Sequence, residues 1–341
     1  DYPLGRHLNS EVSLYLLFSS MDVKFDVMGD PWGARMLEMF PALYKGFVQS
    51  DPGNVSLVPY FAANYQKFRT FKLRENDVWI LSYPKAGSHW VQEMAWCLLH
   101  DCDFELAKKT PADLRFPLID LDYIMEMKPG DLPRLPPFGK TRFEIAEGMA
   151  SPRFIKSHLP LSLLPLGLLD TCKVIYIARN PFDTVVSYHH HYKVVFGDSF
   201  TASFEEFFEA FMAEKILWDP YKNNIIEAWN KREHKNLCLF FYEEMKLNLD
   251  ENIKKMCTFL GKSISDSNRE KLLEHLSFDS FKKNTSVNWE ARKDAVNSKH
   301  DFLRKGIVGS WKEVLNESQV ARIKEMMNQH FKPIGLNFIC E

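Results

Sequence analysis

The sequence predicts an α/β fold in which a single domain, residues 1–341, has a central parallel sheet flanked by helices. Four short apolar segments have the composition of buried strands, and helical patterns directly follow three of them. The first strand ends in a turn with Lys85 and Gly87, similar to the phosphate-binding turns that join a strand to a helix. We expect residues 1–30 to form an N-terminal extension and residues 101–151 a lid-like helical insertion.

The predicted strands and helices alternate along the chain. We place strands at residues 78–83, 153–156, 173–178 and 237–242, with helices directly after the first, third and fourth. Apolar residues recur at helical spacing over residues 32–47, and the aromatic segment 61–72 leads into the first strand. A capping box formed by Ser203 and Glu206 begins a helix that runs to about Lys215. Further helices are predicted at residues 221–231, 252–260, 267–276 and 318–331.

The composition excludes several classes of function. With 45% hydrophobic residues and 27 Phe, the chain can bury a large core, and its net charge of −2 gives no general attraction for nucleic acids or anionic membranes. No apolar run reaches the roughly 18 residues of a membrane-spanning helix, and residues 1–20 lack the features of a signal peptide. The six cysteines show neither CxxC pairs nor metal-ligand spacing. We therefore expect a cytoplasmic protein with reduced thiols.

The turn after the first strand carries the first candidate site. A helix that begins here would point backbone N–H groups outward, where they can hold an anion. Lys85 adds a mobile charge, Gly87 lets a phosphate approach the backbone, and Ser88 adds a hydroxyl. The order of residues is not that of a Walker loop. A simple βα turn with a solvated lysine remains the alternative.

A second candidate site follows the third strand. Arg179 ends this strand, and Asn180 and Pro181 have the preferences of an N-cap and a first helical residue. Arg179 would lie at the C-terminal edge of the sheet, where its guanidinium suits bidentate phosphate binding, and Ser187 could add a hydroxyl two turns later. A structural ion pair between Arg179 and Asp183 is the alternative.

A third stretch runs from Arg304, Lys305 and Gly306 to Trp311 and Lys312, and alone it would be taken for a solvated loop. Together, the three stretches resemble the cytosolic sulfotransferase family, and so does the segment from Ile155 to Pro160. The resemblance extends from about residue 32 to the end of the chain.

This resemblance implies that the site takes 3′-phosphoadenosine 5′-phosphosulfate (PAPS) or its desulfated product, adenosine 3′,5′-bisphosphate (PAP). The segment Lys85, Ala86, Gly87, Ser88, His89 and Trp90 matches the family's loop around the 5′-phosphosulfate. Contacts to the 3′-phosphate are implied for Arg179, Ser187, Arg304, Lys305 and Gly306. The adenine surroundings are implied to include Trp90, Tyr242 and Phe278.

His158 matches the family's catalytic base. A neutral imidazole can remove the proton that makes an alcohol a poor nucleophile. Lys85 and Lys156 would stabilise the charge on the transferring sulfuryl group and the leaving phosphate. The run His189, His190 and His191 suggests a metal site, but consecutive helical residues point about 100° apart. We therefore predict no metal.

The sequence departs from the family pattern in three places. His89 stands where the family usually has Thr, and Leu276 stands where a hydroxyl commonly lies near the adenine. In the family's dimer motif, Asn316, Glu317 and Ala321 replace Thr, Val and Glu. A homodimer is therefore left open.

The insertion at residues 101–151 is long, apolar and rich in proline, which is typical of a functional lid. Ile119, Tyr123 and Met127 fall one helical turn apart, and Thr141 begins a capping box ahead of a short helix with Phe143. We predict that Tyr123, Met127 and Phe143 contact a substrate. A packed surface appendage is the alternative.

The insertion and His89 resemble an insect member of the family, a retinol dehydratase. This resemblance implies a hydrophobic alcohol as acceptor, retinol among them, and its dehydration to anhydroretinol through a sulfonated intermediate. The alternatives are a stable sulfate ester of a phenol, sterol or other lipophilic alcohol, and a non-catalytic carrier of retinoid or nucleotide. A phosphotransferase similar to nucleoside kinases would need a Walker lysine and a Mg²⁺-binding carboxylate, and neither is evident.

Overall fold

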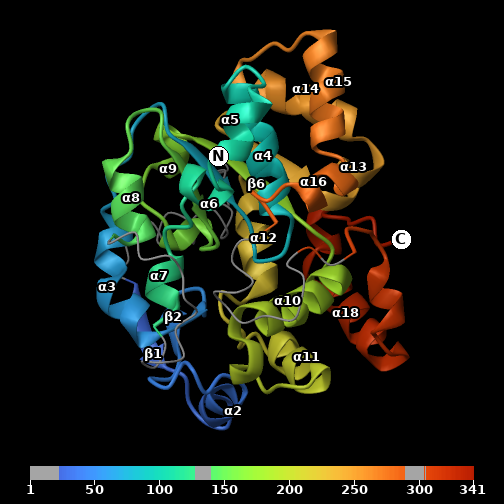
Figure 1. The fold of residues 1–341 in the computed structure, drawn as a ribbon. Coiled ribbons are helices and arrows are strands. Elements are labelled where there is room, and N and C mark those ends of the chain that lie inside the picture. Colours follow the sequence, from blue (N-terminus) through green and yellow to red (C-terminus); the bar gives the residue numbers. More distant parts are fainter. Residues whose placement is uncertain (1–22, 127–139, 289–302, 304) are drawn as a thin grey trace, which may run out of the picture.

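The computed structural model describes residues 23–126, 140–288, 303 and 305–341. Its centre is a four-stranded sheet in the order β5-β4-β6-β7, in which all neighbours run parallel (Figure 1). The strands are β4 (Val78–Leu81), β5 (Phe154–Ser157), β6 (Lys173–Ala178) and β7 (Leu237–Phe241). The four predicted strands and their parallel arrangement are thus confirmed.

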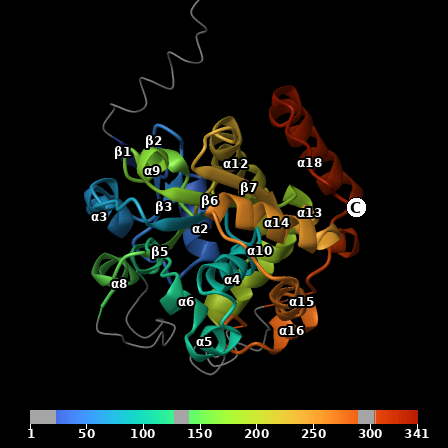
Figure 2. The same cartoon turned by 90° about the horizontal axis from the view of Figure 1, so that it is seen from above.

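Both faces of this sheet are buried by helices. Successive side chains of β4 point to opposite faces, so Trp79 and Leu81 join one hydrophobic core while Val78 and Ile80 join the other. As predicted, helices directly follow three strands: α4 (Ser88–Leu99) follows β4, α10 (Pro181–Phe196) follows β6, and α13 (Tyr242–Leu247) follows β7 (Figure 2). Because the strands are parallel, the N-termini of these helices meet at one edge of the sheet.

The sequence did not predict a second, antiparallel sheet near the N-terminus. It consists of β1 (Lys24–Val27), β2 (Val48–Asp51) and β3 (Ser56–Leu57). Part of the extension is therefore a paired strand, although most of its residues are exposed. The predicted helix at residues 32–47 was also too long, because α2 (Trp32–Met39) ends before Pro41, which cannot donate a helical hydrogen bond.

In its described parts, residues 101–126 and 140–151, the insertion forms four short helices: α5 (Phe104–Lys109), α6 (Ala112–Arg115), α7 (Leu121–Ile124) and α8 (Arg142–Gly148). Between α6 and α7 the chain lies along the edge strand β5. Lys156 N donates to Pro117 O and Ile119 N donates to Lys156 O, both at 3.0 Å. The insertion is therefore attached to the strand that leads to His158. The capping box at Thr141 is confirmed.

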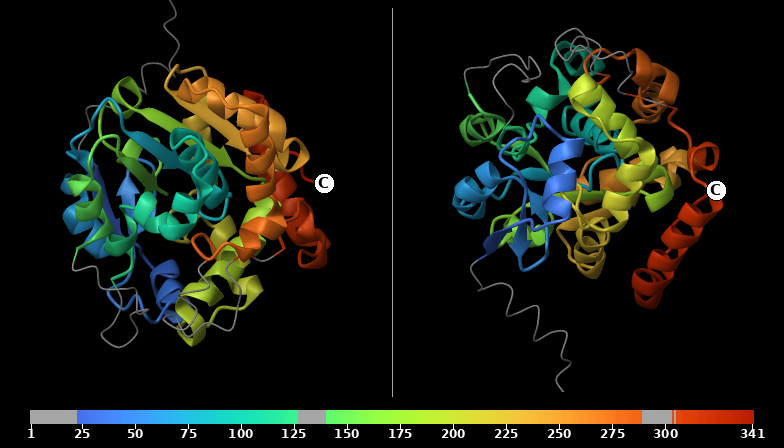
Figure 3. Two further views of the ribbon diagram at one scale, coloured as in Figure 1. Left: turned by 45° about the horizontal axis from the view of Figure 1, so that its top comes forward. Right: turned by 90° about the horizontal axis from the view of Figure 1, so that it is seen from below.

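The other helices lie close to their predicted positions. The capping box at Ser203 is confirmed, but its helix ends at Met212, and α16 was not predicted. Three-residue or four-residue 3₁₀ turns begin at residues 161, 197, 310 and 332. The C-terminal helix α18 lies on the side of the molecule opposite α3 (Figure 3). The remaining helices are α3 (Pro59–Arg69), α9 (Leu168–Thr171), α11 (Phe204–Met212), α12 (Tyr221–Asn230), α14 (Leu249–Leu260), α15 (Asp266–His275), α16 (Phe278–Lys283) and α18 (Glu317–His330).

The helices and the cysteines of the described chain bear on the predictions about membrane spans and thiols. Among the residues that the structure describes, no helix combines the length and hydrophobicity that a membrane span requires. All six cysteines are free, and five of them are buried. Burial raises the pKa of Cys172 to about 12 and that of Cys238 to about 11. These thiols are therefore protonated at neutral pH and act as core residues.

Candidate active site

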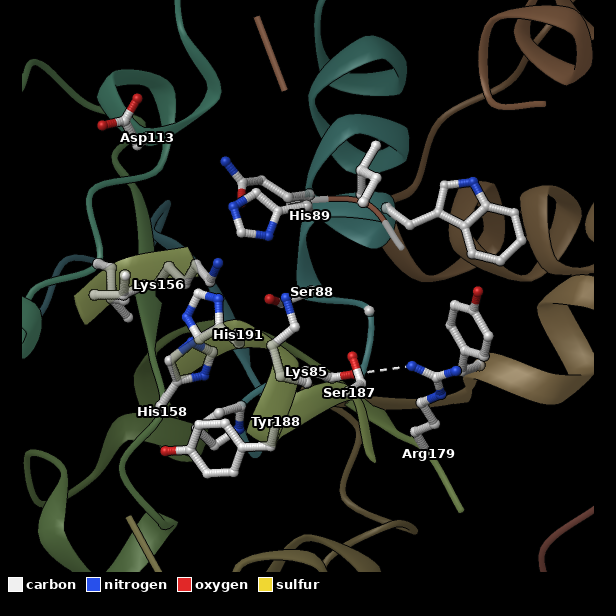
Figure 4. Close-up of a pocket in the computed structure, with 18 of the residues that line it drawn as sticks. Lys85, Ser88, His89, Asp113, Lys156, His158, Arg179, Ser187, Tyr188 and His191 are labelled. Atoms are coloured by element: carbon white, nitrogen blue, oxygen red, sulfur yellow. Dashed lines mark hydrogen bonds between the residues drawn. The ribbon is translucent and has the colours of Figure 1, made fainter. Parts of the chain in front are cut away.

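A large cavity opens at the C-terminal edge of the parallel sheet. Lys85, His158 and Arg179 line it, and each follows the end of a different strand (Figure 4). The space between its walls is about 1710 Å³, with open solvent at its mouth included. The turn at Lys85, the start of α10 at Arg179 and the C-terminal stretch at Lys305 therefore meet at one cavity. The cavity lies where ligands bind in open α/β sheets.

The turn between β4 and α4 needs glycine because a neighbouring ring packs directly against its backbone. Gly87 is the N-cap of α4 with φ of 104°, a conformation that favours glycine. A Cβ atom at this position would lie 2.7 Å from the ring of Tyr242. Lys85 also has positive φ, at 68°, which is uncommon for a long side chain and is found where surrounding structure imposes it.

Arg179 faces the cavity with part of its hydrogen-bonding capacity unused. Its Nη1 donates to Lys85 O at 3.4 Å, and its guanidinium stacks 4.3 Å from the centre of the Tyr242 ring. Its Nη2 lies 4.0 Å from Asp183 Oδ2, beyond hydrogen-bond distance. Its buried Nε has no hydrogen-bond partner among the described residues. A buried donor of this kind fits an anion held in the cavity.

Asp183 forms the ion pair with Arg179 considered above, at 4.0 Å, and also binds the C-terminal motif. Its carboxylate accepts hydrogen bonds from Gly309 N at 2.9 Å, Ser310 Oγ at 3.0 Å and Trp311 N at 3.2 Å. The Trp311 ring stacks on Phe182, with 4.7 Å between ring centres. The first turn of α10 therefore holds the C-terminal motif against the sheet edge, which leaves Arg179 available to the cavity.

The C-terminal motif contributes Lys305 and Gly306 to the wall of the cavity. Gly306 has φ of 63°, and a Cβ there would lie 2.0 Å from the Phe278 ring, so only glycine fits. Lys305 forms an ion pair with Glu313. Arg304 lies outside the described residues.

Aromatic side chains form the adjacent wall. The rings of Trp90 and Tyr242 lie 5.6 Å apart, and Phe278 lines the same part of the cavity. Trp90 Nε1 donates to the backbone carbonyl of Leu276 at 2.9 Å. Position 276 thus positions this wall through its backbone, although it lacks the hydroxyl common in the family.

The contacts of His158 leave one ring nitrogen directed at the cavity. Nδ1 lies 2.8 Å from Ser82 O, and because a carbonyl can only accept, this geometry assigns the proton to Nδ1. Nε2 is then an acceptor. Burial, followed by the charge of Lys156, lowers the pKa of His158 well below its usual value. The imidazole is therefore neutral at physiological pH and competent as a base.

The backbone of His158 is held from both sides. Its N–H donates to Asp120 Oδ1 at 3.3 Å, and its carbonyl accepts from Asn224 Nδ2 at 3.0 Å. Asp120 also accepts from Trp218 Nε1 at 2.8 Å, and the Trp218 ring stands edge-on to the imidazole. The insertion, which carries Asp120, therefore helps to fix the imidazole.

Lys156 shares the centre of the cavity with His158 (Figure 4). Burial lowers its pKa to about 7, while Asp120 and Asp113 oppose this shift. An ammonium group so close to losing its proton is a strong hydrogen-bond donor whose charge responds to an arriving anion.

Two further histidines line the same space. Burial is the largest cause that lowers the pKa of both His89 and His191; the charge of Lys156 comes next for His89, and that of Lys85 for His191. His191 was not among the predicted site residues. It belongs to a stripe on α10 that follows Ser187 at helical spacing, and this period could have revealed it. The stripe comprises Tyr188, His191, Tyr192 and Val195.

The consecutive histidines do not converge on a common point. His189 packs against Phe200, Phe204 and Phe207, whereas His191 faces the cavity. Among the described residues, one group with metal-ligating atoms within 4.8 Å of one another consists of Glu93, Cys97 and His275. Glu93 there accepts from Arg115 at 2.6 Å and pairs with His275 at 2.8 Å, so this group is a buried ion-pair cluster.

The insertion lines one side of the cavity, but not with the residues predicted to contact a substrate. Tyr123 and Phe143 pack against Phe68 of α3 and do not line the cavity, and Met127 lies outside the described residues. Of the predicted helical row, Tyr123 lies in the single turn of α7, whereas Ile119 precedes this helix and pairs with β5. The insertion residues that do line the cavity are Asp113, Phe116, Leu118, Leu121, Met125 and Arg142.

Comparison with known proteins identifies the family. A family model described as a sulfotransferase domain matches residues 75–335. The chain belongs to this sulfotransferase family. It is also 31% identical over 281 residues to sulfotransferase 1B1 of Mus musculus. The matched region covers 82% of this chain and 90% of the mouse protein. Membership makes it a sulfotransferase-type enzyme.

Two solved structures are similar to this chain over nearly its whole length. Both are of retinol dehydratase, one in complex with retinol and PAP and the other with androsterone and PAP. Each superimposes with a TM-score of 0.85 at 27% identity; the first covers 94% of this chain and 99% of the other, and the second 93% and 98%.

Proposed function

We propose that this sulfotransferase uses PAPS to sulfonate a long hydrophobic alcohol, and that with retinol the sulfate is eliminated to give anhydroretinol. The observation that carries this proposal is the continuity of one cavity, which joins the phosphate-binding turn to an apolar wall contributed by the insertion, with His158 between them. The similarity to a retinol dehydratase that binds retinol and PAP supports the choice of acceptor.

The residues present fit a doubly phosphorylated nucleotide. The buried Nε of Arg179, which has no hydrogen-bond partner among the described residues, is a donor for one anion, and the start of α4 after Gly87 offers backbone N–H groups to another. We assign the 3′-phosphate to Arg179, Ser187, Lys305 and Gly306, and the phosphosulfate to the turn from Lys85 to Trp90. PAPS, when bound, supplies the sulfuryl group.

The transfer step requires a base and positive charge on opposite sides of the acceptor oxygen. His158 Nε2 accepts the hydroxyl proton while the oxygen forms its bond to sulfur. Lys85 and Lys156 stabilise the negative charge that grows on the sulfuryl oxygens and the leaving phosphate. This step yields the sulfate ester of the alcohol, PAP and one proton on His158.

The second step depends on the acceptor. In retinyl sulfate the C–O bond is allylic to a polyene, so sulfate can leave with the bonding electrons and the resulting cation is delocalised. Loss of a proton from a carbon next to the cationic system then gives the alkene, and the released sulfate balances the reaction. An apolar wall favours proton loss because it keeps out the water that would otherwise capture the cation.

The test is to incubate the protein with PAPS and retinol and to identify the products by mass spectrometry and absorbance. We expect anhydroretinol together with PAP and free sulfate in equal amounts. Stable retinyl sulfate as the end product would contradict the dehydration while leaving the transfer intact. A His158→Ala variant is the control, because a non-catalytic carrier would retain its function without this base.

A second product type has specific support. The similar retinol dehydratase was also solved with androsterone, a saturated alcohol whose sulfate cannot form an allylic cation. We infer that saturated alcohols and phenols would leave this cavity as stable sulfate esters. A panel of such acceptors, analysed in the same assay, separates the two outcomes.

A further inference from the structure

An arginine and an aspartate lie in the part of the cavity that is otherwise apolar. Arg142 begins α8 and Asp113 lies in α6; both line the cavity, together with Phe116, Leu121 and Met125. Asp113 projects from α6 on the insertion side, apart from the histidines and lysines at the centre (Figure 4). The proposed transfer step uses neither charge.

The guanidinium of Arg142 is held in place from outside the cavity. Asp122 accepts from both the backbone N–H and Nη1 of Arg142. The Arg142 side chain is only 7% exposed. Burying a cation in an apolar wall is costly unless its donors have hydrogen-bond partners. A donor of Arg142 that faces the cavity therefore favours a polar group of a bound ligand.

The Arg142 and Asp113 side chains are placed so that a third polar atom beside the pair could contact both. Arg142 Nη2 lies 4.0 Å from Asp113 Oδ2, which exceeds a hydrogen bond but is short enough for one oxygen to contact both. A hydroxyl oxygen can accept from Nη2 while its proton is donated to the carboxylate. A carbonyl can do only the first, and a methyl group can do neither.

We propose that this pair, Arg142 and Asp113, binds a second hydroxyl group of the acceptor, so that the cavity also takes lipophilic diols and binds them more tightly than monohydroxy alcohols such as retinol. One hydroxyl would meet His158 and the other would bridge Arg142 and Asp113. The inference goes beyond the proposed dehydration of retinol, because it names a further acceptor class, and it rests on the same sulfotransferase site. A site that offers hydrogen bonds to a hydroxyl discriminates strongly against an analogue without it.

The test compares unbranched α,ω-diols of increasing length with 1-alkanols of the same length as acceptors for PAPS. We expect one range of lengths in which the diol has a KM at least about tenfold lower than the alkanol, after correction for its two reactive ends. The matching ω-keto alcohol should fall between them. Equal KM values for diol and alkanol at every length would overturn the proposal.

Two variants assign the preference to the named pair. In Asp113→Asn and Arg142→Lys, the ratio of diol to alkanol KM should approach one, and the ratio is unaffected by any general loss of activity. A purely structural ion pair would leave the ratio unchanged, and that result would also overturn the proposal.

A binding measurement separates this inference from the proposed function. Calorimetric titration of the protein saturated with PAP should show tighter binding of the diol than of the alkanol, whether or not transfer occurs. If the diol binds more tightly but no alcohol is sulfonated, the proposed function has failed and this inference stands. Equal binding of the two would contradict the inference alone.

Discussion

The side of the cavity that we propose for the nucleotide (the nucleotide side) and the side that we propose for the alcohol (the acceptor side) are built in different ways. The nucleotide side consists of short segments that are contiguous in sequence: the turn from Lys85 to Trp90, the start of α10, and the C-terminal motif. The acceptor side takes single residues from α10, the segment at Leu217 and Trp218, and several turns of the insertion. The first is determined by local backbone geometry, and the second by how distant elements pack.

This difference predicts different responses to substitution. The nucleotide side uses glycine conformations, helix N-termini and cations, so a single change there removes a specific contact. The acceptor side uses apolar surface, which tolerates exchange of residues as long as volume is conserved. His158 and Lys156 lie where the two sides meet, so substitutions there should affect chemistry more than binding.

The largest effect is expected for His158→Ala. Loss of the base should lower kcat by about 10²- to 10⁴-fold, the usual contribution of general base catalysis. PAP affinity, measured by calorimetry, should stay within about twofold of the wild type, because the proposed phosphate contacts do not include the His158 imidazole. A parallel loss of PAP binding would show that the two sides are not separable at this residue.

Arg179→Ala should weaken PAP binding by about 10- to 100-fold, since charge-assisted hydrogen bonds contribute about 1.5–3 kcal/mol each. Arg179→Lys is the matched control, and it should recover part of the affinity because the charge remains while the fork geometry is lost. Titration calorimetry with PAP measures both. If the alanine variant binds PAP as well as the wild type, Arg179 has only a structural role.

A pair of substitutions on α7 tests which side of this helix faces the acceptor. Leu121→Trp should raise the KM of retinol by about tenfold, because added volume in a packed wall costs about 1–3 kcal/mol, and it should leave PAP affinity unchanged. Tyr123→Phe, on the opposite side of the turn, should alter neither quantity. Initial-rate kinetics with varied retinol provide the measurement. A larger effect at position 123 would reverse the assignment of the two sides.

The smallest effect concerns pH. The pKa of Lys156 is lowered to about 7 by burial, so its ammonium form, which favours an anion, is lost as pH rises through this value. PAP affinity should therefore fall several-fold between about pH 6.5 and 8.5, with at most tenfold per pH unit for one coupled proton. His158 stays neutral throughout this window, since its pKa lies well below 6.5.

Calorimetry in buffers of different ionisation enthalpy checks this linkage, because proton uptake on PAP binding should appear above pH 7. In a Lys156→Met variant the dependence on pH should flatten. An unchanged slope in that variant would assign the titration to another group.

The same contrast explains how much of the molecule was predictable. The parallel sheet, the helices after β4, β6 and β7, and the caps at Asn180, Ser203 and Thr141 were predicted because strand composition and capping act over a few neighbouring residues. For the same reason the turn after β4, which we propose binds phosphate, could be located from its residues alone.

Only the tertiary structure decided the features that depend on distant partners. The sequence of α7 indicated a helical period, but its packing on α3 determined that Leu121 and Met125, not Tyr123, face the cavity. His191 lines the site because α10 presents that side to the centre.

The hydrogen bonds that Asp183 forms in addition to its ion pair with Arg179 were likewise decided by a segment more than a hundred residues away, the C-terminal motif at Gly309 and Ser310. Hydrogen-bonding preferences and periodicity are properties of a short stretch of chain, and they determined the elements and the anion-binding turn. The face that each element buries depends on which surfaces the whole chain can bring together, and that was decided only by the fold.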